Sequence, residues 1–217
     1  RWKIVGNDTC KMCVKPNCRQ HEATLFHILN NCDSFLGESE RMTWRHNSIL
    51  NYITQTTKEK LPGHIQVFAD LEGHKVNGLT IPPHIMVTSS RCDLVIIDSS
   101  TTPTTVYLLE LTVCFERQDN IDAANRRKYN RYSSLATDIQ EAGYICKNIP
   151  FEVGSRGHLT LSNKSTLSII HKLCQPNTNF TSFWRNISKT SLLCSYTIYL
   201  SRNDPWTDVP LLSPVKQ

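Results

Sequence analysis

Two apolar segments near the middle of the chain each carry one carboxylate. Asp93 precedes the apolar run 94–97, and Glu110 is the single charge in the apolar or hydroxylic segment 105–115. Both segments are predicted to be strands. Because hard divalent cations prefer oxygen ligands, two carboxylates on adjacent strands predict a Mg²⁺ or Mn²⁺ site. Such a metal binds phosphate and lowers the pKa of an attacking water, which is the chemistry of a phosphodiesterase.

The same two carboxylates also allow an interpretation without catalysis. Asp93 can be a turn residue at a strand end, and Glu110 can pair with a Lys or Arg at the edge of the core, since an unpaired buried carboxylate is costly. Residue spacing alone does not separate the two interpretations.

A basic amphipathic helix is predicted from about residue 120 to 142. Lys128, Arg131 and Tyr132 lie on one side of it, at i, i+3 and i+4 spacing. A lysine that reaches back to the carboxylates would stabilise the charge that develops on the phosphorus centre. The arginines of this helix and Tyr132 are candidate DNA contacts, although a run of charges on a helix is usually solvated.

The spacing C-x2-C-x13-H-x4-C near the start of the chain is that of a tetrahedral structural zinc site. Unrelated thiols and a surface histidine are the alternative, and Cys18 and His21 are competing ligands. The predicted zinc ligands are Cys10, Cys13, His27 and Cys32.

The order of these motifs resembles the restriction-like endonuclease of site-specific non-LTR retrotransposons, a branch of the PD-(D/E)xK nuclease superfamily. The matching residues are Asp93, then Glu110-Leu111-Thr112, then Lys128-x-x-Arg131-Tyr132. In that branch the catalytic lysine is thought to have moved from the second strand to the following helix, and Thr112 stands where the parent motif has lysine. A Cys-Cys-His-Cys knuckle precedes the nuclease in these proteins.

Three positions depart from the family pattern. Cys92 replaces the usual proline, Glu110 stands where many relatives have Asp, and Arg131 replaces a second lysine. Two further segments resemble the family. Arg45-His46 resembles the Arg-His pair between the knuckle and the nuclease, which is thought to assist DNA handling. Residues 150–157 resemble the glycine-containing turn of the family, and Arg156 in this turn is a candidate DNA contact. A solvated helix face and a plain hairpin turn are the respective alternatives.

The resemblance implies that Asp93 and Glu110 hold one or two Mg²⁺ ions and that Lys128 stabilises the transition state. It also implies nicking of a chromosomal DNA target whose 3′ end primes reverse transcription of the element RNA. The partners would be that RNA and a reverse transcriptase domain upstream in the same polyprotein, and the location would be nuclear. A zinc-containing nucleic-acid-binding module with a decayed nuclease site is the alternative function.

Composition bounds the remaining interpretations. The 217 residues can bury a proper core, and the net charge of +5 allows contact with a polyanion without demonstrating it. Nine cysteines and several N-glycosylation tripeptides raise the alternative of a secreted disulfide-bonded glycoprotein. The odd cysteine count and the single cysteines in apolar surroundings favour a reducing compartment instead.

We expect an α/β fold with a central mixed sheet flanked by helices and a small N-terminal zinc knuckle. The predicted divisions are a zinc knuckle (1–36), a linking helix (37–62), a nuclease domain (63–202) and a loose C-terminal tail (203–217). Asp70 and Glu72, which lie before the core strands, are candidates for a further metal ligand. Since the chain begins with Arg1, we expect it to be a piece of a longer protein.

Overall fold

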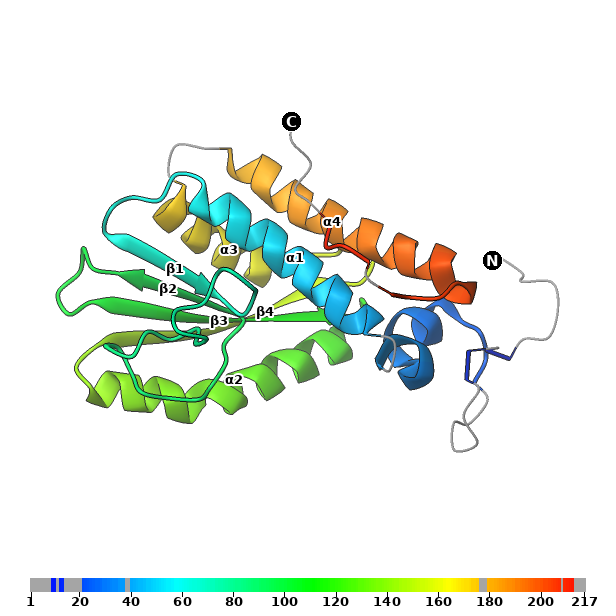
Figure 1. Ribbon diagram of the computed structural model, residues 1–217, viewed down its shortest axis with the longest axis horizontal. Helices are drawn as coiled ribbons and strands as arrows, with labels where there is room; N and C mark the ends of the chain where they lie inside the picture. The colour runs from blue at the N-terminus through cyan, green and yellow to red at the C-terminus, as the bar shows by residue number, and fades with distance from the viewer. Residues whose placement is uncertain are drawn as a thin grey trace.

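A four-stranded sheet with strand order β1-β2-β3-β4 lies at the centre of the chain (Figure 1). The structure is a computed structural model that describes residues 9–10, 12–13, 21–37, 40–175, 179–207 and 209–212. The first three strands pair antiparallel, and β4 pairs parallel to β3, so the sheet is mixed as predicted. The strands are β1 (Ile65–Ala69), β2 (Leu94–Asp98), β3 (Thr105–Cys114) and β4 (Ile145–Gly154).

Helices cover both faces of the sheet, and Figure 1 shows α1, α3 and α4 on one side and α2 on the other. The long helix α2 (Gln118–Glu141) joins β3 to β4, because parallel neighbouring strands require a crossover connection. The other helices are α1 (Arg41–Lys58), α3 (Leu161–Cys174) and α4 (Phe180–Leu200). The predicted α/β architecture is therefore confirmed.

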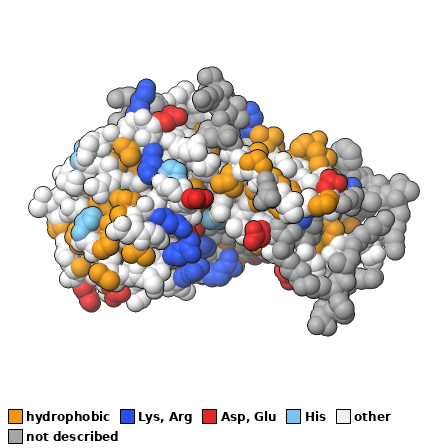
Figure 2. All heavy atoms as spheres, viewed as in Figure 1, with side chains coloured by type: hydrophobic (Ala, Val, Ile, Leu, Met, Phe, Trp, Pro, Cys, Tyr) orange, Lys and Arg blue, Asp and Glu red, His pale blue; other side chains and the backbone are white. Residues whose placement is uncertain are grey.

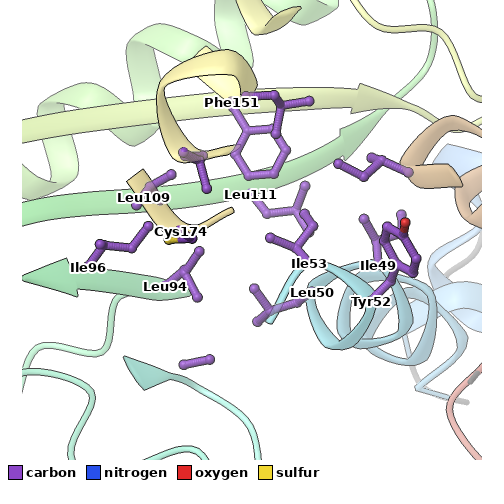
Figure 3. Close-up of a cluster of buried hydrophobic side chains, with 14 of the residues drawn as sticks. Ile49, Leu50, Tyr52, Ile53, Leu94, Ile96, Leu109, Leu111, Phe151 and Cys174 are labelled. Carbon is purple, nitrogen blue, oxygen red and sulfur yellow. The ribbon is translucent and has the colours of Figure 1, made fainter. Parts of the chain in front are cut away.

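Alternation along β3 decides which side chains meet which helix layer. Leu109 and Leu111 belong to the large core cluster beneath α1, α3 and α4, part of which is shown in Figure 3. Val106 and Leu108 belong to the cluster on the α2 side. Glu110 is in phase with Leu108, so β3 presents this carboxylate to α2.

The knuckle packs beside the start of α1 and the end of α4 (Figure 1). A single antiparallel bridge joins Thr9 to Glu22, and two π-helical turns follow at His27–Asn31 and Asp33–Gly37. No disulfide bond joins one described cysteine to another. Among the described helices, none has an apolar stretch that could cross a lipid bilayer.

The chain after α4 is not loose, contrary to the sequence-based expectation. A short 3₁₀ turn (Ser201–Asn203) leads to Trp206, whose ring lies edge-on to Trp44 at 5.0 Å between centroids. The indole N–H of Trp44 donates to Pro210 O (3.0 Å), and Leu212 N donates to Ser48 Oγ (3.3 Å). This segment is ordered because its apolar side chains cover a side of α1 that would otherwise face solvent. Residues 213–217 lie outside the described residues.

Candidate functional site

Three thiols and one imidazole meet at the N-terminal end of the described chain. A turn in which Cys13 N donates to Cys10 O (3.2 Å) supplies two thiols, and the first π-helical turn with the residue after it supplies His27 and Cys32. All four side chains are buried, and their ligand atoms lie within 4.8 Å of one another. The residues predicted from the C-x2-C-x13-H-x4-C spacing therefore come together.

The distances within this cluster fit a tetrahedral zinc ion. Cys32 Sγ lies 3.9 Å from Cys10 Sγ and 3.8 Å from Cys13 Sγ, and Cys13 Sγ lies 3.1 Å from His27 Nε2. With Zn–S bonds of about 2.3 Å, ligand atoms at the corners of a tetrahedron are about 3.7 Å apart. Burial lowers the pKa of His27, which favours the neutral imidazole that a metal requires.

Of the two competing ligands, His21 is described and does not belong to the cluster. It is exposed, and its ring centroid lies 4.9 Å from that of His27. Cys18 lies outside the described residues.

The zinc cluster is part of a hydrophobic core rather than an isolated appendage. Its three cysteines pack in one buried cluster with Trp44 of α1 and with Cys194 and Ile198 of α4. Asn30 Nδ2 also donates to Ser155 Oγ (3.3 Å), which follows β4. The knuckle therefore contacts the same helix, α1, that packs on the central sheet.

A second polar cluster forms where β2 begins. Because Leu94 pairs with Leu109 in the antiparallel ladder, Asp93 lies opposite Glu110. Asp93 N donates to Glu110 Oε1 (3.0 Å), and Leu111 N donates to Asp93 Oδ2 (2.8 Å). Only 1% of the Glu110 surface is exposed. The two carboxylates predicted to converge are therefore neighbours.

Lys128 of α2 reaches back to both carboxylates. Its Nζ lies 2.8 Å from Glu110 Oε2 and 3.6 Å from Asp93 Oδ2. The side chains of Lys128 and Asp93 are 17% and 14% exposed, so the cluster is buried at Glu110 and opens to solvent at its edge. Lys128 is thus the charged partner of the buried Glu110 carboxylate.

A fourth side chain, His46 of α1, completes this cluster. Its Nε2 lies 3.2 Å from Asp93 Oδ2, and its Nδ1 lies 3.0 Å from Asn47 Oδ1. The sequence indicates His46 only as a candidate DNA contact, and nothing in its spacing links it to Asp93. Helix periodicity places His46 beside the buried face of α1, but the identity of its neighbour depends on how α1 crosses the sheet.

The charges of the four groups balance one another. Burial acts to raise the pKa of Asp93, but hydrogen bonding to His46 and the charges of His46 and Lys128 lower it below its usual value. Burial and the neighbouring Asp93 raise the pKa of Glu110. For His46, burial acts to lower the pKa, but the hydrogen bonds to Asp93 and Asn47 together with the charge of Asp93 raise it above its usual value. The result is two acids and two bases in mutual contact.

The carboxylate cluster has a donor set suited to Mg²⁺ or Mn²⁺, although with fewer ligands than the knuckle. Two carboxylates are present, and among the described residues no hydrogen bond ends on Asp93 Oδ1, which leaves one oxygen for a cation. These ions usually keep several waters and take only one or two protein carboxylates, so the set fits. Within the described ranges, the knuckle alone gathers three or more Cys, His, Asp or Glu ligands.

No family model matches the chain, and no curated protein matches it. Function is therefore inferred from the chemistry of the two clusters.

Two of the predicted DNA contacts are buried, which corrects the sequence-based assignment. Arg45 has no exposed surface, and its Nη1 donates to Ser195 Oγ of α4 (3.1 Å). Tyr132 is 4% exposed, and its hydroxyl donates to Arg91 O (2.7 Å). Both side chains lie on helix faces that tertiary packing covers, so neither can contact DNA in this conformation.

The other two predicted DNA contacts are accessible to different degrees. Arg131 is exposed on α2 and its guanidinium lies 5.3 Å from the Tyr132 ring centroid. Arg156 is 46% exposed, but its Nε pairs with Glu116 Oε2 at 2.7 Å and its guanidinium covers Phe115. A phosphate contact by Arg156 would therefore compete with an existing ion pair.

The candidate for a further metal ligand does not join the carboxylate cluster. Asp70 Oδ1 pairs with Lys75 Nζ and with Arg91 Nη2, both at 2.6 Å. Glu72 is exposed. Asp70 nevertheless lies near the site, because its N–H donates to Asp93 O (3.0 Å).

Proposed function

We propose that the chain is a metal-dependent endonuclease domain that nicks DNA. The observation that carries the proposal is the convergence of three side chains: Asp93, which directly precedes β2, Glu110 of β3 and Lys128 of α2. Two carboxylates can hold a metal that polarises a phosphodiester and activates a water, and a lysine beside them can stabilise the developing charge. The fact that the lysine comes from the helix after β3 supports the resemblance to retrotransposon endonucleases.

Each of these residues would have a separate role in the reaction. Asp93 and Glu110 hold one or two Mg²⁺ or Mn²⁺ ions, which when bound polarise the phosphate and lower the pKa of the attacking water. Lys128 places a positive charge next to the carboxylates, where it stabilises charge that develops on the phosphoryl oxygens. The Leu111 N–H holds Asp93 in place.

The topology supports a restriction-like core. The element order is helix, three antiparallel strands, helix and one parallel strand, with both carboxylates at the same end of β2 and β3. This agrees with the α/β core with a central mixed sheet that the resemblance implies.

DNA is the proposed substrate because of the charge on the side of the molecule near α2. Figure 2 shows Lys and Arg side chains gathered along the α2 side of the face in view. Arg126, Arg127 and Arg131 of this helix are exposed and lie within one turn of Lys128. Arginine and lysine contacts to phosphate position a nuclease without reading sequence.

We further propose that the cut starts target-primed reverse transcription by a polymerase domain in the same polyprotein, within the nucleus. This part depends on the order of motifs, from the zinc cluster through Asp93 and Glu110 to Lys128. The zinc cluster would have a structural role.

A second candidate is a nucleic-acid-binding module whose nuclease site has decayed. The observation that favours it is that Lys128 and His46 already pair with the two carboxylates, as in a purely structural polar network. Such a module would bind DNA with steep salt dependence and produce no cleaved product.

A supercoiled-plasmid nicking assay separates the two candidates. The zinc-loaded chain is assayed with Mg²⁺, with Mn²⁺ and with EDTA, beside Asp93→Ala and the matched control Asp70→Ala. We expect metal-dependent nicking that Asp93→Ala lowers by about 10³-fold or more, since a metal contributes several kcal/mol to transition-state stabilisation. Nicking that persists in Asp93→Ala would exclude this site, and DNA binding without nicking by the folded wild-type chain would favour the decayed module.

A further inference from the structure

His46 is the one member of the carboxylate cluster that comes from outside the sheet and α2. We propose that His46 is a positioning residue that fixes the Asp93 carboxylate for binding of the catalytic cation. The inference rests on the proposed function, which it deepens by assigning to α1 a part in building the metal site.

The first step is how the contacts divide the two oxygens of Asp93. Leu111 N (2.8 Å), His46 Nε2 (3.2 Å) and Lys128 Nζ (3.6 Å) all approach Oδ2. Among the described residues none approaches Oδ1 within hydrogen-bonding distance. Two donors from different elements on one oxygen fix the carboxylate plane, and the other oxygen stays open to a cation.

The second step is that the imidazole is itself fixed. Its Nδ1 lies 3.0 Å from Asn47 Oδ1, and its side chain is only 24% exposed. With both ring nitrogens engaged, the ring has one preferred orientation. His46 is therefore presented to Asp93 before any ligand binds.

The third step concerns the helix that carries His46. On either side of His46 in the chain, α1 is held by buried polar contacts: Arg45 Nη1 donates to Ser195 Oγ of α4, and Leu212 N donates to Ser48 Oγ. Trp44, two residues before His46, packs in the same cluster as the zinc-ligating cysteines. The start of α1 is thereby fixed against α4 and the knuckle, and His46 cannot move away from Asp93 without disturbing them.

Hydrogen-bond partners of a metal-binding carboxylate orient it, and their loss typically costs about 10- to 100-fold in metal affinity or activity. His46 fits this role because it touches the ligand oxygen and leaves the other one open. A direct DNA contact, by contrast, would require an accessible imidazole without a carboxylate partner.

The test is Mn²⁺ binding, measured by electron paramagnetic resonance on the zinc-loaded full chain without DNA. The variants are His46→Ala, His46→Gln, which restores an amide donor near the position of Nε2, and the control His84→Ala on an exposed loop. We expect His46→Ala to weaken Mn²⁺ binding by about 10- to 100-fold, and His46→Gln to restore most of the affinity. Equal thermal midpoints for the two His46 variants show that the difference between them is not unfolding.

A parallel readout separates positioning from DNA contact. With Ca²⁺ in place of Mg²⁺, DNA affinity should change less than twofold in His46→Ala, while the Mn²⁺ concentration for half-maximal nicking rises. Unchanged Mn²⁺ binding with weakened DNA binding would overturn the inference in favour of a DNA contact, and no change in either would make His46 structural. Absence of both Mn²⁺ binding and nicking in the wild-type chain would overturn the proposed function itself.

Discussion

The zinc cluster and the carboxylate cluster are built in opposite ways. The candidate zinc ligands come from one local stretch, residues 10–32, and consist of three thiols and one imidazole. The carboxylate cluster draws single residues from α1, β2, β3 and α2, and contains both acids and bases. Their connection is the start of α1, where Trp44 packs beside the zinc cysteines and His46 contacts Asp93.

This difference in composition implies a difference in metal dependence. Close thiols are held in a tetrahedral arrangement only when a metal compensates their deprotonation, so the knuckle should require its ion to fold. The carboxylates already have Lys128 and His46 as hydrogen-bonding partners, so their arrangement should survive without a divalent ion. One cluster is therefore expected to be structural and the other to bind its metal reversibly.

The strongest test of this contrast is removal of a zinc ligand. Cys32 is fully buried and its sulfur contacts two other ligand sulfurs. We expect Cys32→Ala to lose bound zinc and to destabilise the chain by about 5 kcal/mol or more, because structural zinc contributes its binding energy to folding. Zinc content by atomic absorption and urea unfolding measure the effect.

Cys146→Ala is the matched control, since Cys146 is also buried but lies in the α2-side core. It should keep full zinc content and lose only about 1 kcal/mol. Unfolding of the zinc-loaded wild-type chain should be the same with and without added Mg²⁺. Full zinc occupancy in Cys32→Ala would show that the ligand set is wrong.

Removal of the Lys128 side chain tests the carboxylate cluster. In Lys128→Met, Asp93 and Glu110 lose a partner in a largely buried site, which should cost about 3 kcal/mol of stability. Nicking should fall by about 10²- to 10³-fold, since a transition-state charge partner is gone. Mn²⁺ binding should be retained or tightened, because the lysine occupies Glu110 Oε2 and its charge repels a cation at the open Asp93 Oδ1.

A comparison of Mn²⁺ binding in His46→Ala and Lys128→Met separates the roles of the two side chains. His46→Ala should weaken Mn²⁺ binding, whereas Lys128→Met should not, although both lose a contact to Asp93 Oδ2. Lys147→Met, on the exposed side of β4, serves as the control and should alter neither nicking nor Mn²⁺ binding. Weaker Mn²⁺ binding in Lys128→Met would mean that the lysine supports the metal site instead of competing with it.

Much of this arrangement could be predicted from local sequence. The thiol and imidazole spacing gave the zinc ligands, and the apolar runs around Asp93 and Glu110 gave β2 and β3. The i, i+3 and i, i+4 spacing in α2 put Lys128 on one side with Arg131 and Tyr132, and the lysine was expected to reach back to the carboxylates. In each case the interaction follows from neighbours in the chain or from adjacent strands, where pattern fixes geometry.

Long-range packing set the limit of prediction. Arg45 was expected at the surface, but its position is decided by α4, 150 residues further along the chain, whose Ser195 accepts its hydrogen bond. Tyr132 has its partner in the segment before β2. The covering of α1 by Trp206 likewise depends on tertiary contacts, because a proline-containing tail shows no periodicity. Local sequence patterns do not determine which segments distant in the chain pack against each other.

Arg45 allows a smaller test at the junction of the two clusters. Burial lowers its pKa to about 10, and its Nε and Nη2 have no hydrogen-bond partner among the described residues. Arg45→Met should therefore change stability by only about 1 kcal/mol in either direction, because a packed apolar side chain can replace a poorly paired buried charge. DNA affinity should stay the same.

Arg131→Met is the comparison variant for Arg45→Met, since Arg131 is exposed on α2. Filter binding across a salt series should show weaker binding and a salt slope reduced by about one for Arg131→Met only. Loss of DNA affinity in Arg45→Met with an unchanged thermal midpoint would restore Arg45 as a DNA contact.

The smallest effect is expected at Asp70, which neighbours Asp93 in space but not in role. The side chain of Asp70 is partly exposed and pairs with Lys75 and Arg91. Burial acts to raise its pKa, but hydrogen bonding to these two cations lowers it below the usual value. Asp70→Asn should leave nicking and Mn²⁺ binding unchanged and lower the thermal midpoint by about 2 °C or less, as for partly exposed ion pairs.

The pH dependence of Asp70→Asn gives the sign of this effect. A carboxyl group with a depressed folded-state pKa stabilises the chain above its unfolded pKa and loses this contribution as the pH falls through the folded pKa. Thermal midpoints of wild type and Asp70→Asn should therefore differ at pH 7 and converge in acid, and 1 M salt should shrink the difference. A drop in Mn²⁺ affinity at pH 7 would instead make Asp70 part of the metal site. Such a drop would mean that the metal site extends from Asp93 to Asp70, whose N–H donates to Asp93 O just after β1.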